Sequence, residues 1–257
     1  MDNKVKKKRM SLPVRIMLIV LIILIVIFGV LIGTQLYQFT KMKTVPTGEI
    51  ISGIYAIDNG MVNLYLVKCD DGYLMIDAGS DKNKVDSEFE KSGISIDEIK
   101  IILLTHTDSD HTAALSFFPD AQVYLSNQEV QMIDGSTTRA LLLGKNKISA
   151  SYQTLSDGET VDFLGLSVRG ILTPGHTPGS MCYLINEKYL FTGDNLSLKD
   201  GKVDLFNSFF NMDDEIQRSS LRMLAGLLKE NYPEYIFTAH YGYTGDVDNI
   251  AFKNWLQ

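Results

Sequence analysis

The chain has 257 residues, and its charges are divided unevenly along its length. Residues 1–43 hold eight of the 24 Lys and Arg and one of the 31 Asp and Glu, so residues 44–257 hold 16 and 30, a net charge of −14. Binding to nucleic acid takes most of its affinity from basic side chains that neutralise phosphates. This composition therefore argues against nucleic acid as a partner and favours a small-molecule substrate.

The N-terminus combines a basic stretch with a long apolar run. Six Lys and Arg lie among the first 15 residues, and an uninterrupted apolar run follows from Ile16 to Ile32. The run is longer than that of a signal peptide and no small-residue cleavage site follows it, so residues 16–36 are predicted to be a transmembrane signal anchor. Basic flanks stay in the cytoplasm, which places residues 1–15 inside and the remainder outside the cell membrane. A cleaved signal peptide and a buried core helix are the alternatives.

Residues 37–49 are predicted to be a polar linker, and residues 50–257 suffice for one domain with a sizeable core. Its first half is predicted to contain strands at 54–57, 62–68, 73–76, 100–104 and 122–125 and helices at 81–91 and 111–117. The second half is predicted to contain strands at 153–155, 161–163, 166–172, 181–186, 189–192 and 236–238 and helices at 213–229 and 250–256. The segment 134–151 is either an insertion that selects substrate or a plain connection.

All four histidines of the chain lie at or near the ends of apolar runs. A single histidine near an aspartate is usually an ordinary hydrogen-bonded pair, but four such positions together indicate a metal site. Three aspartates accompany them, and imidazole with carboxylate is a ligand set for divalent first-row metals. The predicted ligands are His106, Asp108, Asp110 and His111 after the run Ile101–Leu104, His176 in a TPGHTPG segment, Asp194 at the end of FTGD, and His240.

In the order and spacing of these motifs, the soluble part of the chain resembles the metallo-β-lactamase fold superfamily. The resemblance begins at about Gly53 and includes the hairpin at 63–79. It implies an α/β (α+β) fold, a four-layer αβ/βα sandwich, preceded here by one transmembrane helix. By the family's pattern the chain binds two divalent metal ions. Metal one takes His106, Asp108 and His176, metal two takes Asp110, His111 and His240, and Asp194 bridges both.

One position departs from the family's usual HxHxDH cluster, because Asp108 replaces its second histidine. A carboxylate adds negative charge and a hard oxygen ligand, which shifts the preference from Zn²⁺ toward iron or manganese. Zn²⁺ is the first expectation, with Fe or Mn as alternatives. Similar HxDxDH clusters resemble those of DNA-uptake channel proteins, and flavodiiron proteins carry a glutamate there, although neither likeness extends along the chain. A diiron site that reacts with oxygen or NO and a metal-stabilised binding module therefore remain rival hypotheses.

The resemblance implies hydrolysis of an ester, thioester, lactone, amide or phosphodiester by a hydroxide that bridges two metals. Asp110 is the predicted catalytic residue, which orients the nucleophile or carries its proton. Asp77 is predicted to support a ligand, or else to cap a turn. Tyr241 and Tyr243 are predicted to contact substrate, or else to form aromatic walls.

Two cysteines, Cys69 and Cys182, lie in strand-like segments. A location outside the cytoplasm permits a disulfide between them. We interpret them instead as two small buried hydrophobic residues.

Overall fold

The computed structural model describes residues 10–139, 144–199 and 202–245, together with residues 247, 252 and 255. Most of the predicted basic segment and most of the predicted helix at 250–256 lie outside the described residues. The chain divides into two compact units, Met1–Lys41 and Met42–Gln257.

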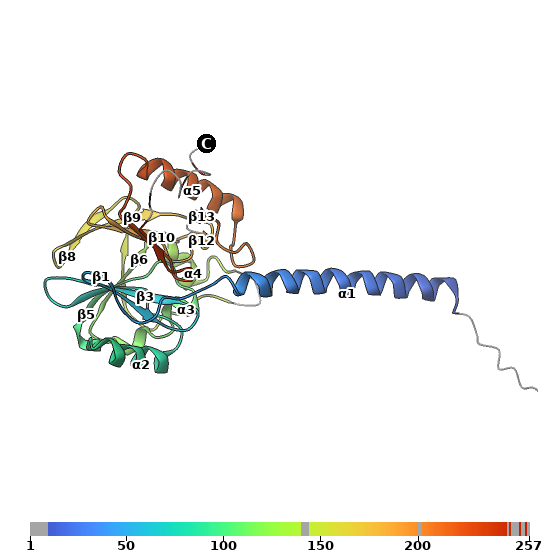
Figure 1. Cartoon of the computed structure of the whole chain (residues 1–257), viewed down its shortest axis with the longest axis horizontal. Helices are drawn as coiled ribbons and strands as arrows, with labels where there is room; N and C mark the ends of the chain where they lie inside the picture. Colours follow the sequence, from blue (N-terminus) through green and yellow to red (C-terminus); the bar gives the residue numbers. More distant parts are fainter. Residues whose placement is uncertain are drawn as a thin grey trace, which may run out of the picture. The chain divides into compact units, whose positions relative to one another are not determined.

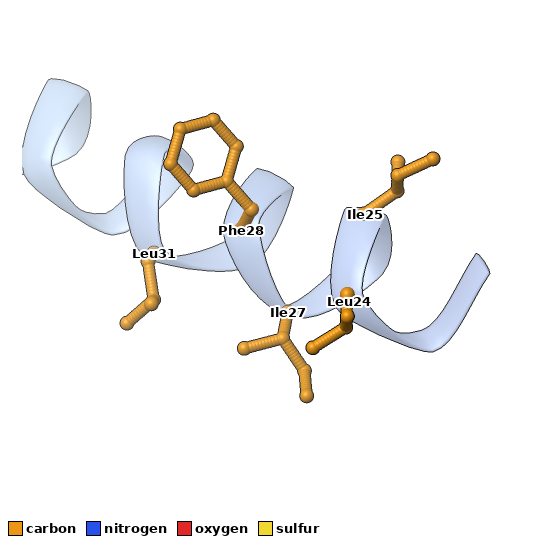
Figure 2. A pocket seen from close by; sticks show the side chains of 5 residues that line it. All are labelled: Leu24, Ile25, Ile27, Phe28 and Leu31. Atoms are coloured by element: carbon orange, nitrogen blue, oxygen red, sulfur yellow. The ribbon is translucent and has the colours of Figure 1, made fainter. Parts of the chain in front are cut away.

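The first unit is helix α1, Leu12–Phe39, which has 28 residues. At 1.5 Å per residue this is about 42 Å, more than the roughly 30 Å of a bilayer's hydrocarbon core. All of its residues are described, and none is buried. Figure 2 shows five of its apolar side chains, Leu24, Ile25, Ile27, Phe28 and Leu31, standing out from the ribbon. The helix extends beyond both ends of the predicted anchor, so its last turn replaces the start of the predicted linker.

The second unit is built from two large sheets and two long covering helices (Figure 1). The first sheet has seven strands in sequence order: β1 (Gly48–Ile51), β2 (Ile54–Asp58), β3 (Asn63–Lys68), β4 (Tyr73–Ile76), β5 (Ile99–Leu103), β6 (Gln122–Ser126) and β7 (Tyr152–Leu155). The second sheet has the order β15 (Tyr243–Thr244), β14 (Tyr235–Phe237), β11 (Tyr189–Phe191), β10 (Met181–Ile185), β9 (Leu166–Leu172) and β8 (Thr160–Phe163). β12 (Ser197–Lys199) and β13 (Lys202–Asp204) pair antiparallel in a small two-stranded sheet.

Three apolar clusters hold these layers together. The middle cluster lies between the sheets and includes Tyr65 and Leu74 from one and Tyr183 and Phe191 from the other. Helices α2 (Lys82–Ser92) and α5 (Asp214–Leu228) each bury one apolar side against a different sheet, and Figure 1 shows them on opposite outer faces. Burial of these faces removes apolar surface from water, which favours the layered arrangement. The predicted αβ/βα sandwich is therefore confirmed.

Strand direction decides where the polar loops gather. Strands β4, β5, β6 and β7 run parallel to one another, and β11 runs parallel to β14 in the second sheet. The carboxyl ends of parallel strands share one edge of a sheet, where α/β proteins place their sites. The residues that follow β4, β5, β11 and β14 include Asp77, His106, Asp194 and His240, in that order.

Several short elements differ from the sequence prediction. The helix predicted at 111–117 is instead a short α3 (Ser109–Thr112) followed by a 3₁₀ turn at Leu115–Phe117, so helical structure begins directly after Asp108. Strand β1 lies partly in the predicted linker, and α4 (Val130–Asp134) follows a 3₁₀ turn at Asn127–Glu129. These elements are too short to show a hydrophobic period. The two cysteines are free; Cys182 is buried as we interpreted, whereas Cys69 is only half-buried.

Candidate metal centre

Asp77 joins three segments at the base of the site. It follows β4 with φ 59°, a left-handed conformation that costs a non-glycine residue about 1–2 kcal/mol. Its carboxylate accepts hydrogen bonds from Thr105 N at 2.8 Å and from Thr105 Oγ1 at 2.9 Å. It also accepts one from His111 Nδ1 at 2.8 Å. The strained turn thus places one buried carboxylate in contact with both the loop that follows β5 and helix α3.

The four histidines share one orientation, in which Nδ1 faces a hydrogen-bond acceptor. The acceptors are Thr105 Oγ1 for His106, Asp77 for His111, Asn211 Oδ1 for His176 and the Met61 carbonyl for His240. An acceptor on Nδ1 places the ring proton there and leaves the lone pair on Nε2. Such outer hydrogen bonds are what orient imidazole ligands in metal sites.

The Nε2 atoms converge with carboxylates in two ligand groups. The first ligand group consists of His106, His176 and Asp194, and the second consists of Asp110, His111, Asp194 and His240. Within each group the ligand atoms lie within 4.8 Å of one another. Asp194 belongs to both, since its Oδ2 lies 3.5 Å from His176 Nε2 and its Oδ1 lies 3.2 Å from His240 Nε2.

These spacings fit a metal ion. Two ligands at about 2.1 Å from a tetrahedral ion lie roughly 3.4 Å apart, and the Nε2 atoms of His106 and His176 are 3.1 Å apart. Two imidazole lone pairs at this distance repel each other unless a cation lies between them. Within the part of the chain that the structure describes, buried His111 Nε2 and Asp194 Oδ1 have no hydrogen-bond partner. An unpaired buried polar atom costs about 1–3 kcal/mol, which a bound cation would offset.

Asp110 is the most open carboxylate of the two groups. Its side chain is 42% exposed, against 4% for Asp194. Burial would raise the pKa of Asp110, but the neighbouring His111 and His240 outweigh burial and lower the pKa to about 2. Asp110 is therefore ionised at neutral pH and accessible from solvent.

Asp108, the residue that departs from the family pattern, faces the first ligand group and is also bound by other side chains. Its Oδ2 lies 3.2 Å from His176 Nε2 and 3.5 Å from His106 Nε2. The same carboxylate accepts hydrogen bonds from Arg139 and from Asn146. Neither Arg139 nor Asn146 was predicted. They lie in the 134–151 segment, whose residues 140–143 are outside the described residues.

Glu129 is a third residue that the sequence reasoning missed. It is fully buried, and it joins the loop of His106 to the loop of His176. Its Oε1 accepts from Thr107 N and Oγ1, and its Oε2 accepts from Thr177 Oγ1 and Gly179 N. A Cβ on Gly179 would lie 2.1 Å from Glu129 N, so only glycine permits this contact. The glutamate follows β6 without any local motif that would have revealed it.

The two tyrosines after His240 differ in position. The Tyr241 ring packs at 6.1 Å from Phe206, whose own ring lies 5.6 Å from that of His240. Burial raises the pKa of Tyr241 to about 12, so the hydroxyl stays protonated. Tyr243 packs instead against Tyr235 and Phe237. The structure therefore brings Tyr241, and not Tyr243, next to the ligand groups.

A family model described as the metallo-beta-lactamase superfamily matches residues 57–240. The match covers most of the second unit and all seven predicted ligands. The chain therefore belongs to the metallo-β-lactamase superfamily, as the sequence motifs predicted.

Individual relatives are similar in sequence to part of this chain. A thioesterase of Emericella nidulans is 30% identical over 171 residues, which are 64% of this chain and 42% of the relative. A probable polyketide biosynthesis zinc-dependent hydrolase of Bacillus velezensis is 35% identical over 102 residues, 38% of this chain and 40% of the relative. The chain thus matches about two fifths of the length of these curated relatives. Their names agree with the predicted enzyme class.

Solved structures show the same fold. A B3 metallo-beta-lactamase with an active-site glutamic acid has a TM-score of 0.63 at 17% identity, covering 87% of this chain and 90% of its own. A metallo-beta-lactamase family protein of Thermus thermophilus has a TM-score of 0.61 at 22% identity, covering 80% and 79%. At these identities the likeness supports the fold alone.

Proposed function

We propose that this protein is a metal-dependent hydrolase in which the two ligand groups hold two divalent ions, Zn²⁺ first and Fe or Mn as alternatives. The observation that carries the proposal is Asp194. Its two carboxylate oxygens face different ligand groups, at 3.5 Å from His176 Nε2 and 3.2 Å from His240 Nε2. A buried carboxylate with this placement can serve two ions at once.

Bound divalent ions would polarise the bond to be cleaved and bring the pKa of a water molecule near neutrality. The protein's own residues then position the reactants. Asp110 is ionised and open to solvent, so it can accept a hydrogen bond from the attacking water and align it with the substrate. The Nδ1 partners hold the four imidazole rings in place, and the Phe206 ring packs 5.1 Å from the His176 ring and 5.6 Å from the His240 ring.

The substrate is proposed to be a small ester or thioester, with lactone, amide and phosphodiester as further classes. The names of the thioesterase and hydrolase relatives favour the first two. Two apolar residues that adjoin the site are open to solvent. Met61 is 53% exposed, and its backbone carbonyl accepts a hydrogen bond from His240 Nδ1; Phe209 is 66% exposed. Phe209 packs on Phe210, whose ring lies 6.3 Å from Phe206. These side chains suit an acyl or aromatic group rather than a polyanion.

We further propose that α1 anchors the protein in the cell membrane in a single pass, with the catalytic domain outside the cytoplasm. The helix is long and apolar enough to cross a bilayer, a test that a signal sequence also passes. The basic residues before it would stay inside. The lipid bilayer is then a partner of the chain through this helix.

The function is tested with the full-length protein in detergent micelles. Metal content is measured, and p-nitrophenyl esters, acyl thioesters, lactones, amides and phosphodiesters are screened at neutral pH. Asp110→Asn should lower kcat about 100-fold or more on the substrate found, whereas Asp97→Asn, an exposed control, should leave it unchanged. Preparations that retain no metal, or an Asp110→Asn variant with full activity, would refute the proposal.

A further inference from the structure

The guanidinium of Arg139 reaches into the first ligand group. Its Nε lies 3.1 Å from Asp108 Oδ1, and its NH2 also pairs with Asp108 Oδ2. Its NH1 donates to the carbonyl of Phe210, in the loop before α5. The side chain is only 21% exposed. All three guanidinium nitrogens of Arg139 are therefore paired, two with Asp108 and one with the Phe210 carbonyl, unlike those of an ordinary solvated surface arginine.

The same guanidinium also contacts a predicted metal ligand. Arg139 NH2 lies 2.9 Å from His176 Nε2, and an arginine can only donate. The proton of His176 is on Nδ1, which faces Asn211 Oδ1 at 3.3 Å. The single lone pair of His176 Nε2 therefore accepts from Arg139. A metal ion would need this lone pair at about 2.1 Å, so the arginine contact and a metal bond exclude each other.

The charge of Arg139 also opposes metal binding at the first ligand group. Asp108 adds a carboxylate to a site that in the family's usual cluster has a neutral imidazole there. Arg139 forms an ion pair with that carboxylate and brings a positive charge to the site. The arginine thus neutralises the extra charge of Asp108 and repels a divalent ion from the first ligand group. Among the described residues, no Lys or Arg pairs with the carboxylates of the second ligand group.

We infer that Arg139 is a built-in cation of the first metal site, which competes with the metal for His176 and Asp108. The inference rests on the proposed metal centre. Arg139 therefore makes the two sites differ in their affinity for metal. The second site fills first, and the first site fills only when Arg139 leaves His176 Nε2.

The test is a titration of the metal-free full-length protein in micelles with Zn²⁺, followed by calorimetry, and with Co²⁺, followed by absorbance. The wild type should bind one equivalent tightly and a second at least about tenfold more weakly, because a charge-assisted hydrogen bond must be broken. Arg139→Met should tighten the second equivalent about tenfold or more. Arg222→Met removes an exposed arginine of α5 and should keep the wild-type pattern.

A second pair of variants reads the first site directly. In His240→Ala, with the second site weakened, the remaining metal binding reports the first ligand group, and adding Arg139→Gln should strengthen it. Circular dichroism checks that each variant is folded. The inference is overturned if Arg139→Met leaves the second equivalent unchanged or weaker, or if adding Arg139→Gln to His240→Ala leaves the remaining metal binding unchanged or weaker. If the wild type binds no metal at all, the proposed metal centre fails as well.

Discussion

Replacing Glu129 tests whether one buried carboxylate holds the ligand loops together. Each of its oxygens accepts one backbone N–H, from Thr107 at 2.8 Å and from Gly179 at 3.1 Å. Glutamine has nearly the same shape but only one oxygen. In Glu129→Gln, one of these two buried N–H groups must therefore face an NH₂ group and lose its acceptor.

The expected cost follows from that count. One unsatisfied buried N–H costs about 1–3 kcal/mol, which corresponds to a fall in Tm of roughly 2–12 °C for a domain of this size. The hydroxyls of Thr107 and Thr177 can rotate to donate elsewhere or to accept from the amide, so they add little. Glu129→Ala leaves both N–H groups without an acceptor and should lower the free energy of unfolding by about 2–6 kcal/mol.

Chemical and thermal denaturation of the full-length protein measure these costs, with metal retention as the second readout. The variant should also bind metal more weakly, since Glu129 joins the loops that carry His106 and His176. Glu90→Gln is the matched control, because Glu90 is exposed on α2 and its change should stay within about 0.5 kcal/mol. A Glu129→Gln protein as stable as this control would show that the buried carboxylate does not hold the loops.

Three further predictions concern the ligands and the anchor. Asp194→Ala should lose both metals or keep one weakly, whereas His240→Ala should mainly empty the second site; two full equivalents in Asp194→Ala would refute the shared ligand. Asp108→His should shift retained metal toward zinc after growth with equal zinc, iron and manganese, and unchanged ratios would remove Asp108 from the ligand set. Protease added outside intact cells should cut residues after about 44 while the anchor stays attached; protection would contradict the orientation, and a mature chain that begins after Gly33 would contradict the anchor.

Much of the fold could be predicted from the sequence because its strands are local patterns. Buried strands such as β5 appear as apolar runs, here Ile101–Leu104, that stop at polar residues, and helix α5 has apolar residues on one side. The ligands lie where these runs end, so the chain order of His106, His176 and His240 was visible. Short elements such as β1 and α3 could not be predicted, because four residues do not display a hydrophobic period.

The sequence by itself determined which residues could bind a metal and that a long apolar helix precedes the domain, since both depend on neighbours along the chain. Only the tertiary structure decided how these residues meet. Arg139 contacts Asp108 and His176 across 31 and 37 residues of sequence, and Glu129 contacts Thr177 across 48. Such contacts leave no periodic trace, because they arise from loops that the packing of two sheets brings to one edge. The same packing turns Asp194 toward both ligand groups, which no spacing in the sequence specifies.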